Sequence, residues 1–125
     1  MIKFSMLFKD NEETQNTDDF MTWLKVTASK LANIPGVDYV EISQNNPFTF
    51  LVEKDTNYYP FQLDIRYRSE EDFNKANENF ANLSNTDNYL MEELIRVEPF
   101  CDIHVCYVEK ISKMNRISRK FFSWK

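Results

Sequence analysis

Glycine is almost absent from this sequence, which contains a single one among its 125 residues. The loops that hold phosphates in dinucleotide-binding and Walker-type motifs are built on several glycines. The scarcity of glycine therefore excludes both kinds of nucleotide site. Long apolar runs are also lacking, so the sequence predicts no membrane-spanning helix. The first eight residues are too short, and too closely followed by acidic residues, to form a signal peptide. We therefore expect a cytoplasmic protein.

Cysteine and histidine are scarce too, because the sequence has only Cys101, Cys106 and His104. These are too few for a zinc site with paired ligands, and a single histidine is a weak basis for metal or haem ligation. We therefore expect no cofactor. On one extended strand the Cα atoms of the two cysteines would lie ~16 Å apart, which is beyond the reach of a disulfide. They are predicted to be buried free thiols.

Basic residues are in deficit over most of the chain. The net charge is −5, yet the last fifteen residues carry five basic side chains and no acidic one. The preceding 110 residues therefore hold 10 basic and 20 acidic side chains. Nucleic-acid binding needs a basic surface, so we expect no nucleic-acid partner for this acidic body.

Aromatic and apolar side chains are plentiful by contrast. The sequence contains 11 Phe, 6 Tyr and 2 Trp, and 42% of its residues are hydrophobic. A chain of this length fits one domain with a substantial core. So many rings in so short a chain predict a core, or a pocket, built on aromatic side chains.

The clearest local pattern is a strand that leads directly into a helix. Residues Phe61–Tyr67 alternate between apolar and polar side chains, which is typical of a half-buried strand. Ser69 follows as a helix cap, with Asp72 three residues later. Acidic residues fill the first turn, where the helix dipole favours negative charge. Phe73 and Phe80 then lie on one helical face, and we expect Phe73 in the helix–sheet core.

The same kinds of pattern predict the remaining elements. The expected strands are residues 2–8, 37–43, 61–67 and 103–109. The first expected helix is capped by Thr17, buries Trp23 and ends near Asn33. The second begins after Ser69, breaks around residues 84–88 and resumes over 89–97. A polar turn covers residues 9–16. Residues 44–60 form a long connection, in which residues 48–52 could be an extra edge strand or a flap.

The order of these elements is β-α-β-β-α-β, which is typical of α+β ferredoxin-like folds. Right-handed crossovers then give one antiparallel sheet with both helices on one face and with the strands at 2–8 and 61–67 in its centre. We expect this domain to span residues 1–111. A basic amphipathic tail follows over residues 112–125.

Three short motifs add a family resemblance. They are the span from Lys3 to Leu7 in the first strand, Ile34-Pro35-Gly36 after the first helix, and Ser69-Glu-Glu-Asp-Phe73 after the third strand. With these motifs, residues 1–111 resemble the EthD-like branch of the dimeric α/β-barrel superfamily. The resemblance implies a homodimer in which two ferredoxin-like sheets face each other. It also implies the binding or conversion of a small apolar, aromatic or polyketide-like compound. In one departure, Thr27 occupies a position of the first helix where such proteins often carry a histidine.

The polar face of the predicted sheet is the candidate site. In the last predicted strand, apolar residues occur at both odd and even positions, so the pattern does not decide which face is polar. We place His104 and Cys106 on the polar side. This face is either simply solvated, as in many one-sided sheets, or lines a cavity between two subunits. In the second case its charges should be paired, as Asp64–Arg66 and Lys3–Glu41, because an unpaired buried charge is costly. The candidate residues on this face are Lys3, Ser5, Glu41, Gln62, Asp64, Arg66, His104 and Cys106.

Two of these residues are the candidate catalytic groups, His104 and Asp64. Histidine is the residue type that most readily exchanges a proton near neutral pH, so His104 is either a general base or a hydrogen-bonded structural residue. Asp64 could orient it, although the strand at residues 2–8 separates the two. The other six residues are predicted to line a pocket.

Two functions stay open at this point. One is an enzyme of the cyclase or cofactor-independent oxygenase kind, which would enclose a reactive ring compound and move one proton. The other is a non-catalytic ligand-binding or protein-interaction module of the same fold. An RNA-recognition domain shares the element order, but it needs aromatic side chains on the open face of its central strands. This chain has polar residues there, so we reject that function.

The tail has a pattern of its own. Ile111, Met114, Phe121 and Trp124 recur at roughly helical spacing, and the basic residues lie mostly elsewhere on the helical wheel. Such a helix could anchor to a membrane surface, bind nucleic acid, or fold back on the acidic body. Its positive charges are too few and its apolar face too short for stable membrane association. We therefore expect the tail to dock within the dimer.

Overall fold

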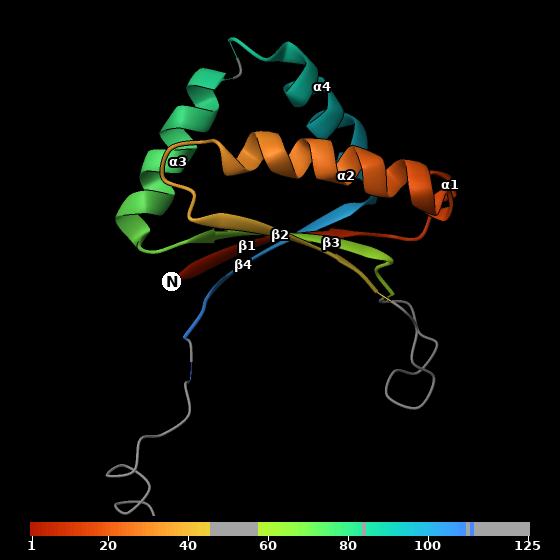
Figure 1. Cartoon of the computed structure of the whole chain (residues 1–125), viewed down its shortest axis with the longest axis horizontal. Helices are drawn as coiled ribbons and strands as arrows, with labels where there is room; N and C mark the ends of the chain where they lie inside the picture. Colours follow the sequence, from red (N-terminus) through yellow and green to blue (C-terminus); the bar gives the residue numbers. More distant parts are fainter. Residues whose placement is uncertain (46–57, 84, 110, 112–125) are drawn as a thin grey trace, which may run out of the picture.

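A four-stranded antiparallel sheet with helices on one face forms the protein in the computed structural model (Figure 1). The structure describes residues 1–45, 58–83, 85–109 and 111. The strands are β1 (Ile2–Phe8), β2 (Tyr39–Gln44), β3 (Phe61–Tyr67) and β4 (Cys101–Tyr107). The helices are α1 (Glu12–Gln15), α2 (Thr17–Ala32), α3 (Glu70–Leu83) and α4 (Asn88–Val97), followed by a 3-10 turn at Glu98–Phe100.

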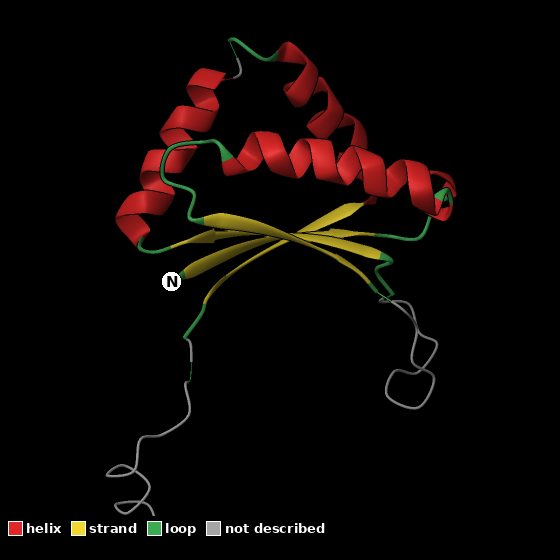
Figure 2. Cartoon of the chain, viewed as in Figure 1, coloured by secondary structure: helices red, strands yellow, loops and turns green. Residues whose placement is uncertain are grey.

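The topology confirms the predicted ferredoxin-like fold. The strand order is β2-β3-β1-β4, and each neighbouring pair is antiparallel. The two strands expected in the centre, β1 and β3, are the central ones. Figure 2 shows the helices together on one side of the sheet, so no helix of the described residues covers the other face.

Strand register divides the side chains between two faces. Phe4 lies between Ile65 on β3 and Val105 on β4, and all three point toward the helices. The other surface is called the open face here. It carries Lys3, Ser5, Leu7, Tyr39, Glu41, Ser43, Gln62, Asp64, Arg66, Asp102, His104 and Cys106. The pairing of β1 with β4 therefore confirms that His104 and Cys106 belong to the polar side of the sheet.

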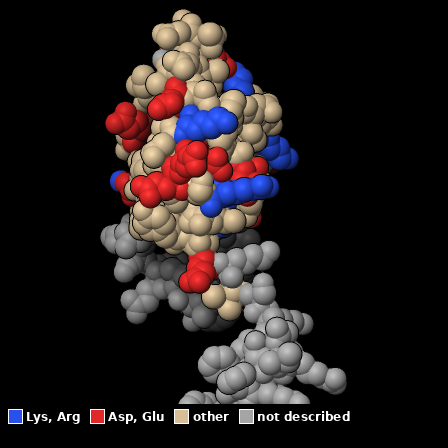
Figure 3. Space-filling model, turned by 90° about the vertical axis from the view of Figure 1, so that its left-hand side faces the viewer, with Lys and Arg blue, Asp and Glu red and all other residues tan. Residues whose placement is uncertain are grey.

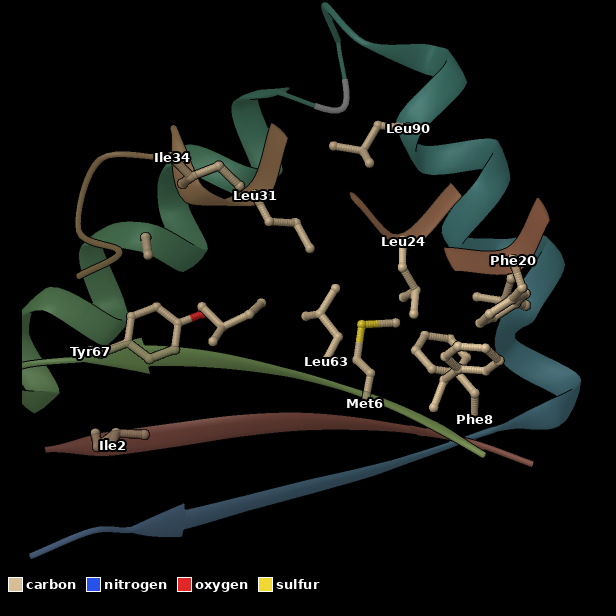
Figure 4. Packing of buried hydrophobic residues seen from close by; sticks show 14 residues of the cluster. Ile2, Met6, Phe8, Phe20, Leu24, Leu31, Ile34, Leu63, Tyr67 and Leu90 are labelled. Atoms are coloured by element: carbon tan, nitrogen blue, oxygen red, sulfur yellow. The ribbon is translucent and has the colours of Figure 1, made fainter. Parts of the chain in front are cut away.

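The core lies between the sheet and the helices, and four of the fourteen buried side chains in its cluster are aromatic (Figure 4). Phe8 and Leu24 are fully buried, and the rings of Phe8 and Phe20 meet edge to face with centroids 5.2 Å apart. Each such side chain stabilises the fold by about 1.5–3 kcal/mol through burial. Trp23 and Phe73, both predicted in the core, are half-buried residues packed against its edge.

Helix starts follow the predicted pattern in α3 and α4 but not in α2. The Asp72 backbone N–H donates to Ser69 Oγ at 3.1 Å, so Ser69 caps α3 as expected. The second helix breaks where predicted, and it resumes because Asp87 Oδ1 accepts from the Leu90 backbone N–H at 2.9 Å. The predicted cap at Thr17 is wrong, because Thr17 is already the first helical residue of α2 and Asn16 occupies the cap position without a side-chain cap hydrogen bond.

Two other local predictions need correction. The predicted polar turn at residues 9–16 contains the short helix α1, closed by reciprocal hydrogen bonds between Asn11 and Thr14. Four residues are too few to show helical periodicity, which is why the pattern missed this turn. Strand β4 begins at Cys101 rather than Ile103, because its pairing with β1 continues to Phe8. The predictions for residues 48–52 and for the tail at 112–125 lie outside the described residues.

Surface charges of both signs are interspersed on the side of the molecule seen in Figure 3. The acidic side chains of the first turn of α3 contribute to the negative charge of the described part. Arg68 pairs with Asp38 through its Nε atom at 3.1 Å, which ties the start of α3 to the loop before β2. Such exposed pairs add little stability, so the fold depends on packing.

The backbone at Gly36, in the loop after α2, lies close against α3. Gly36 has a φ of 104°, which side chains with a Cβ rarely adopt. A Cβ here would lie 2.6 Å from the Asp72 carbonyl oxygen and 2.8 Å from the Ala76 backbone nitrogen. The Asn79 side chain also donates to the Pro35 carbonyl oxygen at 3.1 Å. Two of the three motifs behind the family resemblance thus contact each other.

We therefore predict that Gly36→Ala strongly destabilises the protein. The strained φ alone should lower the free energy of unfolding by about 1–3 kcal/mol, and the clash with the α3 backbone adds to this. Urea denaturation monitored by circular dichroism measures the change. Ala32→Ser, at an exposed position four residues earlier, is the matched control and should leave stability nearly unchanged. A Gly36→Ala variant as stable as the wild type would contradict the close approach of α3.

Candidate functional site

A row of polar side chains crosses the whole open face. Glu41 on β2, Asp64 on β3, Ser5 on β1 and His104 on β4 are direct cross-strand neighbours in that order. The period-two alternation of the strands produces this row, because each residue points to the same side of the sheet. All eight residues of the predicted site thus share one face, and four of them form one line.

Hydrogen bonds hold the middle of this row. Ser5 Oγ donates to Asp64 Oδ1 at 2.5 Å, and Gln62 Nε2 donates to both carboxylate oxygens at 2.9 and 3.1 Å. Ser5 and Asp64 are 2% and 6% exposed, so this carboxylate is buried and satisfied without a cation. The Ser5 proton points to Asp64 and away from His104. His104 itself is exposed on the edge strand and is separated from Asp64 by β1.

The charge pairs on this face differ from the predicted ones. Arg66 Nε lies 3.2 Å from Glu41 Oε1, whereas the sequence predicted Asp64–Arg66 and Lys3–Glu41 pairs. Arg66 and Asp64 are two residues apart on one strand. Glu41 lies diagonally across from Arg66, at a distance that a long arginine side chain spans easily.

An apolar hollow lies on the opposite, helix-covered side of the sheet. It has a volume of about 340 Å³ and lies between the sheet, the end of α2, α3 and α4. We call it the helix-side pocket. Its lining residues are Phe4, Met6, Leu31, Ile34, Val37, Ile65, Tyr67, Ala76, Asn77, Phe80, Met91, Leu94, Ile95, Glu98, Cys101 and Ile103. None of the eight residues of the predicted site belongs to this lining.

The break in the second helix creates the pocket. Helices α3 and α4 diverge from their connection, so they cover the sheet as two separate walls (Figure 1). Ile95 on α4 and Ile103 on β4 are 62% and 53% exposed, which places the mouth of the pocket between these two elements. The sequence periodicity of α4 predicts a row of apolar side chains that faces the interior. It cannot tell whether that row packs against other side chains or lines a hollow.

Four lining residues carry polar groups. Burial raises the pKa of Tyr67 to about 12 and the pKa of the Cys101 thiol to about 11. Both groups are therefore protonated at neutral pH and act as hydrogen-bond donors rather than as nucleophiles. Asn77 and Glu98 are exposed at the rim. Among the described lining residues, Glu98 is the one with a charged side chain.

A second, smaller hollow of about 270 Å³ lies between α2 and α4. Glu93 at its wall accepts hydrogen bonds from Trp23 Nε1 at 3.2 Å, from the Tyr89 hydroxyl at 3.2 Å and from Arg96 Nε at 2.7 Å. Arg96 also pairs with Glu13 and holds the pKa of Glu93 below its ordinary value. This network ties α4 to α1 and α2, so the polar groups here serve the structure.

No family model and no curated protein matches this sequence. The fold, however, is similar to several solved structures. An EthD family protein from Bacillus halodurans C-125 superposes with a TM-score of 0.56 at 15% identity, over 87% of this chain and 99% of that one. A candidate antibiotic biosynthesis monooxygenase from Deinococcus radiodurans gives 0.52 at 12% identity, over 91% and 98% of the two chains. A dimeric ferredoxin-like protein from an uncultured marine organism gives 0.50 at 11%, over 88% and 96%.

These similarities define the class of fold. The chain has the α+β ferredoxin-like architecture found among dimeric proteins, and the EthD-like resemblance is confirmed at the level of the fold. Within the described residues, no group of three or more His, Cys, Asp or Glu side chains is placed to hold a metal ion. None of the described helices combines the length and apolarity needed to cross a membrane.

The raised pKa of Tyr67 predicts a loss of stability at high pH. The phenol ionises near its ordinary pKa of 10.0 in the unfolded chain and at about 12 in the folded one. The folded state therefore binds this proton more tightly, and its stabilising contribution, present below about pH 10, is lost as the pH rises toward 12. A difference of two pKa units between the folded and the unfolded state corresponds to about 2–3 kcal/mol in the free energy of unfolding.

Urea denaturation at a series of pH values above neutrality tests this prediction. Tyr67→Phe cannot ionise, so its stability should fall less steeply than that of the wild type above about pH 10. Tyr39→Phe, which removes an exposed hydroxyl from the open face, is the control. Parallel curves for the wild type and Tyr67→Phe would contradict the burial of this side chain.

Proposed function

We propose that this chain binds a small apolar or aromatic molecule in the helix-side pocket. The supporting observation is the pocket itself, an apolar hollow of about 340 Å³ that opens between α4 and β4. Protein pockets for small ligands usually enclose about 300–1,000 Å³, so this one suits a compact ligand. Its rings, aliphatic chains and sulfur atoms favour an aromatic or otherwise cyclic occupant.

Binding without chemistry is the function that the pocket supports best. A cyclase or cofactor-independent oxygenase would need a group that accepts a proton from the enclosed ring compound. The buried polar groups of the pocket, Tyr67 and Cys101, hold their own protons at neutral pH. The carboxylate among the described lining residues, Glu98, is exposed at the rim rather than placed over the apolar interior. The candidate catalytic residues His104 and Asp64 lie on the other side of the sheet. We therefore favour the ligand-binding module over the enzyme.

We also propose that the protein is a homodimer in which the open faces of two copies meet. On the described part of the chain, no helix covers this face, although Ser5 and Asp64 in its centre are buried and Leu7 is half-buried (Figure 2). A satisfied polar row with an apolar neighbour suits contact with a second copy. The fold is shared with dimeric ferredoxin-like proteins, which supports the same assembly. Nucleic acid and membranes are not among the proposed partners.

The pocket can be tested with a neutral fluorescent probe. N-phenyl-1-naphthylamine should bind the wild type with increased fluorescence. Ile103→Trp places a large ring at the pocket mouth and should weaken binding by about tenfold or more, because overfilling a packed site is costly. Val26→Trp is the matched control, since Val26 is 51% exposed, close to the 53% of Ile103, but lies at the smaller hollow between α2 and α4. Equal binding by both variants would place the ligand elsewhere.

Assembly can be tested by light scattering. At micromolar concentration the wild type should have twice the chain mass of 15.0 kDa. Leu7→Arg puts a charge in the centre of the open face and should shift the protein to a monomer, because a buried unpaired charge is costly at an interface. Val26→Arg, on the helix layer, should stay dimeric. A monomeric wild type, or a Leu7→Arg variant that folds and remains dimeric, would count against the open-face dimer.

A further inference from the structure

The Tyr67 hydroxyl is an unusual polar group in the helix-side pocket. Tyr67 ends β3, and its side chain is only 4% exposed. Its ring is fixed edge to face on Phe73, with centroids 5.0 Å apart and planes at 86°. Figure 4 shows its oxygen directed toward the interior of the apolar cluster. The hydroxyl therefore has a fixed position on the wall of the pocket.

Within the described residues, this hydroxyl has no hydrogen-bond partner. Three other tyrosine hydroxyls have a partner, because Tyr58 donates to the Asn45 carbonyl oxygen, Tyr59 to Asp102 and Tyr89 to Glu93. The remaining two, Tyr39 and Tyr107, are exposed to solvent, whereas Tyr67 is buried. Among the described side chains, every fully enclosed nitrogen or oxygen atom has a partner. The Tyr67 oxygen is thus not sealed inside the core, and it borders the open space of the pocket.

We propose that the Tyr67 hydroxyl donates a hydrogen bond to a carbonyl oxygen of the ligand, and that the ligand is a compact, uncharged cyclic ketone or quinone. This inference rests on the proposed function of the pocket and adds the chemical class of its occupant. An occupant that fills the pocket would bury this hydroxyl, and a buried hydroxyl without a partner is unfavourable. A ligand carbonyl removes that cost, whereas a hydrocarbon of the same shape leaves it in place.

The lining explains why the ligand is uncharged. The described lining residues include no lysine, arginine or histidine, so a ligand carboxylate would be buried without a counter-charge. Glu98 at the rim would also repel it. A ligand cation would find a counter-charge among the described lining residues only in Glu98, which is exposed at the rim.

The lining also favours a ring system and an acceptor. The sulfur atoms of Met6, Met91 and Cys101 suit contact with the edge of an aromatic ring. Because burial raises the pKa of Tyr67 to about 12, the phenol keeps its proton and stays a donor across the physiological range. A carbonyl oxygen, which only accepts, is the complementary group.

A matched pair of probes separates the carbonyl from the shape. 9-Fluorenone and fluorene have the same ring system, and only fluorenone carries a carbonyl. Their affinities can be measured by displacement of N-phenyl-1-naphthylamine from the full-length protein. Tyr67→Phe removes the hydroxyl alone, and Tyr39→Phe on the open face is the control. Melting temperatures show that each variant is folded.

The expected result is specific to one probe and one variant. Tyr67→Phe should weaken fluorenone binding by about three- to tenfold, the effect of one neutral hydrogen bond, and leave fluorene binding unchanged. Tyr39→Phe should affect neither. Infrared spectroscopy gives a second readout that does not need the variant, because the C=O stretch of fluorenone bound to the wild type should lie below its value in hexane.

Each contrary result has its own meaning. If fluorenone and fluorene respond identically to Tyr67→Phe, or the bound C=O stretch matches that in hexane, Tyr67 is not the anchor, although the pocket still binds ligands. If N-phenyl-1-naphthylamine, fluorenone and fluorene all fail to bind the wild type, the proposed function of the pocket is itself wrong. The two proposals can therefore fail separately.

Discussion

The contact of the α3 backbone with Gly36 is the constraint from which the rest of the helix layer follows. Because this position lacks a Cβ, α3 lies directly on the loop after α2. The ring of Phe73 in the first turn of α3 also packs on Tyr67 at the end of β3. The chain then breaks and returns as α4, which is tied to α1 and α2 through Glu93 and Arg96. One anchor thus lies near the start of α3 and the other on α4. Together they hold the two helices apart, and the helix-side pocket lies between α3 and α4.

Most of the fold could be predicted from the sequence, because local chemistry fixes it. The alternation in residues 61–67 and the cap at Ser69 describe β3 and the start of α3 as the structure has them. The pocket could not be predicted, since Ile65, Phe80 and Leu94 show the apolar spacing of core residues. Whether such a stripe meets another element or a hollow depends on the direction of α4. That direction is set by contacts between residues far apart in the sequence, such as Trp23 with Glu93.

The open face shows the same limit for polar groups. Alternation placed Ser5 and Asp64 on one face correctly. It was ambiguous for the last strand, and the pairing of β1 with β4 puts His104 beside Ser5, as predicted. The alternation could not predict which charged side chains form pairs, because pairing depends on the diagonal distances between strands and on side-chain length. Asp64 is satisfied by Ser5 and Gln62, and so Arg66 is available for Glu41. The catalytic role considered for His104 and Asp64 stays a prediction.

Strand β4 has a consequence for how the protein can be studied. Its two cysteines are five residues apart on one strand, so Cys101 faces the helix-side pocket and Cys106 faces the open side of the sheet. An edge strand gives each thiol a different environment within a single element. Thiol labelling followed by mass spectrometry can therefore report on the two faces at once. Protection of Cys101 would track occupancy of the pocket, and protection of Cys106 would track coverage of the opposite surface.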